Sequence, residues 1–151
     1  MELDLVKVFI DLPADEPFET EAFWAKKVGD SIYNIENVPF FSYEVHFNDI
    51  VEAIPIESSS QLKIIKIVKP SNRFETRVVL NNFNLIENQE KLLYTFSLFD
   101  LEYEHAKNGF FAISLAKKSD ISKFERALIP LVSEDLISYD AFPFEMHEKN
   151  S

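Results

Sequence analysis

Histidine and carboxylate side chains are the groups in this sequence that could do acid–base or metal chemistry. The three histidines are His46, His105 and His147. No two of them have the spacing of a metal-binding pair such as HxH or HExxH. His46 stands close to Glu44, and His105 directly follows Glu104. The pattern favours structural or surface roles for both, and an enzyme that uses His46 with a nearby carboxylate is the least favoured hypothesis.

Paired carboxylates would suit a glycosidase, which places two acids on either side of the bond to be cleaved. Glu102 and Glu104 alternate along a predicted strand and would share one of its faces. Asp49 and Glu52 flank the start of another strand. A chain with 26 acids among 151 residues brings such pairs together by chance. A solvated, charged strand face is therefore the favoured interpretation.

Other catalytic and cofactor classes are excluded by residues that the chain lacks. It contains no cysteine, which excludes disulfides, thiolate nucleophiles, thiolate zinc sites and iron–sulfur clusters. It contains two glycines, and neither adjoins a serine, which excludes a nucleophile elbow, a P-loop and a GxGxxG cradle. We therefore expect no catalytic residues, no bound metal and no cofactor.

The charge balance restricts the class of partner. The formal net charge is −11, and the residues before Pro70 carry 6 lysines against 13 acids. Proteins that grip phosphates normally present a basic face, so we expect no nucleic-acid partner and assign the aromatic residues to the core. A basic protein partner suits the charge. The acidic N-terminus lacks the features of a signal peptide, and no apolar run reaches the ~18 residues of a membrane helix. A cytoplasmic protein is expected.

The first half of the chain reads as short strands joined by tight turns. Gly29 suits a turn that needs a positive φ, and Pro39 belongs at a strand edge or in a turn because it has no N–H to donate. A series of short strands joined by tight turns predicts a small, curved, barrel-like antiparallel sheet. The strands are expected at residues 5–12, 21–27, 31–35, 49–56 and 62–68.

The second half alternates strands with helices. Strands are expected at 73–80, 101–105, 110–116 and 137–144, and Asn108-Gly109 predicts a type I′ hairpin turn. One helix is expected at 87–99, with an apolar face of Leu92, Leu93, Phe96 and Phe99. A second starts near 119–122, where Ser122 and Glu125 have capping-box spacing, and Pro130 should kink or end it. The order β-α-β-β-α-β predicts a ferredoxin-like half.

The expected fold class is therefore α+β, with the curved sheet at 1–70 packed against the ferredoxin-like half at 71–146, followed by a frayed tail at 147–151. The boundary falls at the polar, proline-containing stretch 69–72.

One run of the first half resembles a known family. The residues that carry the resemblance are WAKKVGD at 24–30, Tyr33, NVPFFSY at 37–43 and DIVEA at 49–53. They are similar to a bacterial family of uncharacterised domains marked by WAxKVGD, Tyr, NxPFFxY and DxVEA. The resemblance implies a small intracellular bacterial protein and supplies no catalytic residues.

These observations favour a non-enzymatic acidic binding protein, most concretely an immunity-type protein that neutralises a basic toxin or effector. The alternative is a small-molecule sensor with a pocket between the two halves. The oligomeric state is left open. The acids expected to contact a basic partner lie on and around the run that carries the resemblance: Glu36, Glu44, Asp49, Glu52 and Glu57.

Overall fold

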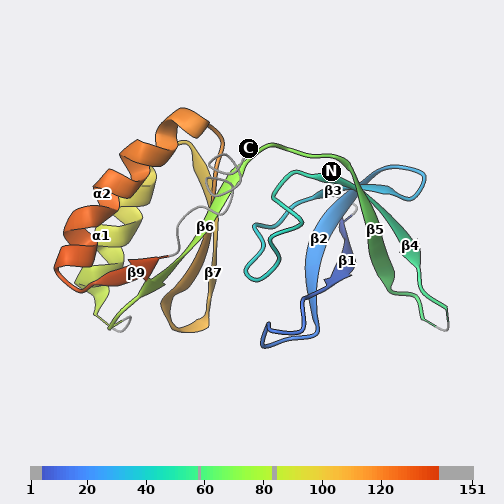
Figure 1. Cartoon of the computed structure of the whole chain (residues 1–151), viewed down its shortest axis with the longest axis horizontal. Helices are drawn as coiled ribbons and strands as arrows, with labels where there is room; N and C mark the ends of the chain where they lie inside the picture. Colours follow the sequence, from blue (N-terminus) through green and yellow to red (C-terminus); the bar gives the residue numbers. More distant parts are fainter. Residues whose placement is uncertain (1–4, 58, 83–84, 140–151) are drawn as a thin grey trace. The chain divides into compact units, whose positions relative to one another are not determined.

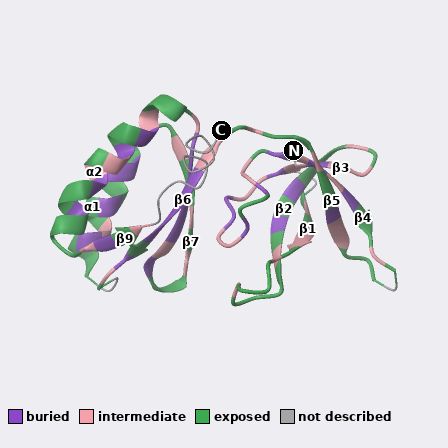
Figure 2. Ribbon diagram, in the orientation of Figure 1, coloured by how far each residue is buried: buried purple, intermediate pink, exposed green. Residues whose placement is uncertain are grey.

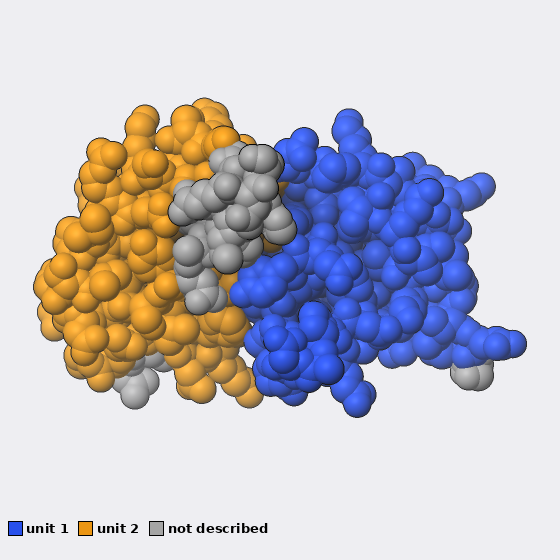
Figure 3. Space-filling view, in the orientation of Figure 1, with its two compact units in different colours: residues 1–72 blue, residues 73–151 orange. Residues whose placement is uncertain are grey.

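The protein is described by a computed structural model of residues 5–57, 59–82 and 85–139 (Figure 1). Its internal contacts divide the chain into two compact units, residues 1–72 and 73–151 (Figure 3). The fold is mixed α+β, with two mostly antiparallel sheets and two helices. The tail predicted at 147–151 and the end of the strand predicted at 137–144 lie outside the described residues.

The first unit is a closed barrel of five strands that follow one another around the barrel in chain order. The predicted curved N-terminal sheet is confirmed, but it is not entirely antiparallel. The barrel closes where the first and last strands meet in parallel, at the pairs Val8–Leu62 and Phe9–Lys63. The strands are β1 (Leu5–Asp11), β2 (Thr20–Gly29), β3 (Ile32–Ile35), β4 (Ile50–Pro55) and β5 (Leu62–Lys69).

Strand alternation fills the barrel with one set of side chains and leaves the other set outside. On β2, Phe23 and Ala25 are buried in the barrel, whereas Trp24 between them is 44% exposed. Lys7 stands opposite Trp24 on β1, with its Nζ 4.7 Å from the centroid of the indole ring. The only tryptophan therefore belongs to the outer surface, held by a cation–π contact. The buried cluster contains Val8, Phe23, Ala25, Tyr33, Ile35, Val45, Val51, Ala53 and Ile64.

The turn between β2 and β3 differs from the prediction. The residue with positive φ is Ser31, at 60°, and not Gly29. Gly29 is the last residue of β2, where the pairing with β3 shifts by one residue after Lys27. A β-bulge adds twist at that point, so the turn is completed two residues later than the glycine.

The second unit has strands β6 (Phe74–Leu80), β7 (Leu101–Ala106), β8 (Phe110–Leu115) and β9 (Ile137–Tyr139), in the sheet order β7-β8-β6-β9, all antiparallel. The helices α1 (Ile86–Ser97) and α2 (Ile121–Ser133) cover one face of this sheet (Figures 1 and 2). Their apolar faces and that sheet face form a separate buried cluster, which includes Leu92, Phe96, Phe111, Ile113, Phe124 and Leu128.

The helix ends show where local patterns predict well and where they do not. The positive φ predicted at Asn108 and Gly109 is confirmed, at 63° and 78°, but the pairing of Ala106 with Phe110 leaves a connection of three residues, Lys107–Gly109. The capping box is wrong: α2 begins at Ile121, so Ser122 lies inside the first turn, and no side chain caps the helix. Pro130 does not end α2, which runs on to Ser133. No helix of the described ranges is long and apolar enough to cross a membrane.

Candidate protein-binding surface

The connection from β3 to β4, residues 36–49, has no helix or strand of its own, yet its backbone is tied down at many points. Glu21, near the start of β2, accepts hydrogen bonds from the N–H groups of Phe40, Phe41 and Ser42, at 2.7, 3.1 and 2.8 Å. One carboxylate thus satisfies three consecutive backbone donors that no strand ladder supplies. The connection is a preorganised loop, because its anchor comes from a neighbouring strand.

Asp49 anchors the other end of this loop. It is 1% exposed, and its carboxylate accepts hydrogen bonds from the N–H groups of His46 and Ser71, both at 2.8 Å. Nδ1 of the His46 ring lies 3.7 Å from the same carboxylate. Burial alone would raise the pKa of Asp49, but the His46 side chain and the two backbone donors outweigh it and hold that pKa below the ordinary value. Asp49 is therefore a buried, ionised anchor.

Two more side chains of the loop accept hydrogen bonds from backbone N–H groups. Oδ1 of Asn37 accepts the N–H of Trp24 at 2.6 Å, which fixes the loop to β2. Oγ of Ser42 accepts the N–H groups of Glu44 and Val45, both at 3.2 Å. These contacts give the loop one conformation and keep Tyr43, between Ser42 and Glu44, 49% exposed.

The connection from β1 to β2, residues 12–19, packs against the anchored loop. The ring of Phe18 meets that of Phe41 edge-on, with the centroids 5.2 Å apart. Phe18 nevertheless remains 57% exposed. The connection surrounds a hollow of about 550 Å³. The connection holds three acids, Asp15, Glu16 and Glu19, and no lysine or arginine.

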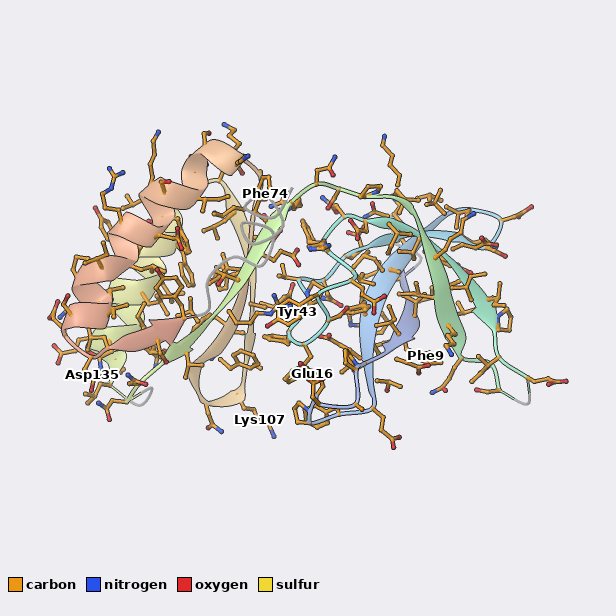
Figure 4. All side chains as sticks on the ribbon, in the orientation of Figure 1. Phe9, Glu16, Tyr43, Phe74, Lys107 and Asp135 are labelled. Carbon is orange, nitrogen blue, oxygen red and sulfur yellow. The ribbon has the colours of Figure 1, made fainter. Side chains whose placement is uncertain are left out.

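The two loops together form an acidic and aromatic surface, which we call the loop surface. Figure 4 labels Glu16 and Tyr43, one from each loop, on the same side of the barrel strands. Among the described residues, no lysine or arginine makes an ion pair with its carboxylates. Such a surface can attract a cation and also offer rings for contact. Its members are Asp15, Glu16, Phe18, Glu19, Tyr43 and Glu44.

The five acids predicted to contact a partner do not form one patch. Glu44 is exposed and belongs to the loop surface. Glu57 is exposed on the separate turn between β4 and β5, and Glu52 stands on β4 directly opposite Lys66. Glu36 is half-buried and accepts a hydrogen bond from Nδ2 of Asn34. Asp49 needs correction, because its carboxylate is buried and bound to backbone donors and cannot meet a partner.

The histidines and paired acids lie in different settings. His46 meets Asp49 as described above. The ring of His105 stacks flat on Phe111, with the centroids 4.2 Å apart. Glu102 and Glu104 stand opposite Ser114 and Ala112 on β8, as their predicted shared strand face requires. Within the described ranges, no three His, Asp or Glu side chains gather as a metal site.

Reasoning from the sequence missed both the acids of the first loop and the anchor Glu21. The acids had a visible signal, since three carboxylates without a base surround a phenylalanine. Glu21 had none, because its partners lie 19 to 21 residues away. Only the closed barrel brings that strand and the loop together.

Comparisons with known proteins fit the fold and the expected resemblance. A crystal structure of a hypothetical protein from Neisseria gonorrhoeae superposes with a TM-score of 0.71, covering 93% of this chain and 96% of that chain at 14% sequence identity. No curated protein matches the chain. A family model described as "Domain of unknown function (DUF4265)" matches residues 21–139. The expectation of an uncharacterised family is thereby confirmed, and this chain belongs to the DUF4265 family.

Proposed function

We propose that this protein acts by binding a basic protein partner through the loop surface, in the manner of an immunity-type protein that neutralises a basic toxin or effector in the cytoplasm. The observation that carries the proposal is the pair of exposed rings, Phe18 and Tyr43, set among acids that form no ion pair with a lysine or arginine of the described residues. Exposed aromatic residues are favoured contact points in interfaces. Surrounding carboxylates would steer a basic partner and raise its association rate.

The anchoring of the loop of residues 36–49 supports the same proposal. A surface already ordered before binding loses little conformational entropy on association. Glu21 and Asp49 supply that order to the loop of residues 36–49, with four hydrogen bonds from its backbone and a fifth from Ser71. We also infer that the second unit is of the ferredoxin-like type, supported by its β-α-β-β-α-β order and its strand order β7-β8-β6-β9. That unit would serve as the scaffold attached to the binding barrel.

The test is co-expression and calorimetry with the basic product of a neighbouring gene. We expect a complex whose affinity falls as salt is raised, and protection of the host from that product's toxicity. The absence of both the complex and the protection would refute the proposal.

Variants locate the surface. Phe18→Ser combined with Glu16→Lys should weaken binding by about tenfold or more, because it removes a ring and reverses a charge. The matched control is Ile86→Ser with Glu87→Lys on α1, where Ile86 is 71% exposed. Equal losses in the two double variants would place the binding elsewhere.

A further inference from the structure

The parallel seam that closes the barrel is incomplete. β1 and β5 pair only at Val8–Leu62 and Phe9–Lys63, although β1 continues to Asp11 and β5 to Lys69. Across the described part of the chain, no residue of β5 after Lys63 pairs with β1. The main-chain groups on that edge of β5 are therefore left without a strand neighbour, which is the condition that invites another extended chain.

A groove lies where the two strands part, with a volume of about 320 Å³. Its apolar lining includes Ile10, Ile64 and Ile67, which also contact the barrel core. Ile65 lines it as well and is 48% exposed. It lies at the irregular point of β5, between the residues paired to Glu52 and Ala53. The groove thus combines an open strand edge with pockets for apolar side chains.

Charged side chains mark the rim of the groove. Nζ of Lys63 and Oδ2 of Asp11 form an ion pair at 2.8 Å across the seam. Glu44 contributes a carboxylate from the anchored loop and Lys66 an ammonium group from β5, so the lining of the groove holds two acids and two lysines. Because Asp11 also borders the hollow of residues 12–19, the groove adjoins the loop surface. The excess of acids that would attract the basic residues of a bound chain therefore lies beside the groove, on the loop surface.

We propose that the groove binds an extended peptide segment with alternating apolar and basic residues, which adds to the edge of β5 by β-augmentation. Main-chain hydrogen bonds would provide affinity, and the isoleucine-lined floor would select apolar side chains at every second position. The inference rests on the proposed function, since it describes how part of the basic partner would be held.

The experiment uses the full chain and three blocked seven-residue peptides. The first alternates lysine and valine, the second is the same peptide with alternate amides N-methylated, and the third replaces lysine by glutamate. We expect the first to bind with a Kd below about 1 mM, and each of the others to bind at least tenfold more weakly. Backbone NMR shifts should change at Ile64–Ile67 on addition of the first peptide.

A matched pair of variants on one strand provides the control. Ile65→Lys places a cation in the groove and should weaken binding of the first peptide about tenfold, whereas Val68→Lys should not. Val68 is 46% exposed on β5 and does not line the groove. Equal binding of the methylated peptide would refute the proposal that the groove binds a peptide by β-augmentation. Chemical-shift changes confined to residues 12–19 and 36–49 would refute it as well. Neither result would contradict binding at the loop surface. No binding of the first peptide would also overturn the groove proposal, while the partner test above decides the proposed function separately.

Discussion

Replacing Asp49 with asparagine should destabilise the barrel by about 3 kcal/mol at neutral pH. The carboxylate is buried and accepts two backbone N–H groups at 2.8 Å each. A hydrogen bond to a charged acceptor contributes roughly 1.5–3 kcal/mol, and a buried donor left without an acceptor costs about 1–3 kcal/mol. Asparagine keeps one neutral oxygen but presents an NH₂ group to the second donor. One bond is therefore weakened, and the other is lost.

The pH dependence follows from the sign of the pKa shift. The folded pKa of Asp49 lies below its ordinary value of 3.8. A group with a depressed folded pKa adds stability that is present above the unfolded pKa and is lost as pH falls through the folded pKa. The difference in unfolding free energy between wild type and D49N should therefore hold at its full size above pH ~5 and shrink below pH ~4.

Urea unfolding followed by Trp24 fluorescence is the suitable assay, because the single tryptophan lies in the barrel unit. The control is Asp30→Asn, an exposed acid in the β2–β3 turn, which should change stability by less than about 0.5 kcal/mol. A D49N effect no larger than that of the control would refute the anchoring role. So would a difference from wild type that stays constant down to pH 3.

Three further changes test other parts of the structure. Glu21→Gln should lower the free energy of unfolding in urea by about 2 kcal/mol, because a neutral acceptor binds the three backbone donors less strongly. Hydrogen exchange at residues 40–42 should become faster, and unchanged exchange there would contradict the role of Glu21. Gly109→Ala should lower stability by about 1 kcal/mol, since φ is 78° there, and a stabilised protein would contradict the turn geometry. Phe124→Ala should lower the free energy of unfolding by about 4 kcal/mol, measured by melting followed with circular dichroism, because the ring is fully buried and contacts Phe96 and Phe99. A decrease of less than about 1 kcal/mol would show that the second core does not depend on this ring.

Local patterns in the sequence predicted the features that depend on near neighbours. Asn108-Gly109 specifies its turn because both residues tolerate positive φ, and no distant contact competes with that preference. The alternation of Leu101, Glu102 and Tyr103 likewise places the two apolar residues beside the second core. The capping box failed for a related reason: the 3₁₀ turn of residues 118–120 leads into α2 two residues early, so Asp120 and not Ser122 takes the N-cap position.

Features that depend on closure of the barrel could not be predicted in the same way. The parallel seam joins residues more than 50 positions apart, and the groove lies where β1 and β5 part after Phe9 and Lys63, although both strands continue. The anchored loop has no periodicity of its own, and its order depends on acceptors from β2 and on Ser71 after β5. Hydropathy and turn patterns do not record such contacts.

The residues that marked the family prove to be chiefly those that build the barrel and its loop. Asn37 fixes the loop to β2, Asp49 anchors its end, and Val51 and Ala53 fill the core. Asp49, Val51 and Ala53 are buried, and the side-chain oxygen of Asn37 is bonded to the N–H of Trp24. The surface proposed to bind takes most of its acids from residues 12–19, outside the run that carried the resemblance. In this chain, the residues that carry the resemblance therefore build chiefly the scaffold, although Tyr43 at the end of NVPFFSY also belongs to the loop surface. Searches for the partner should start from the side chains of the two loops.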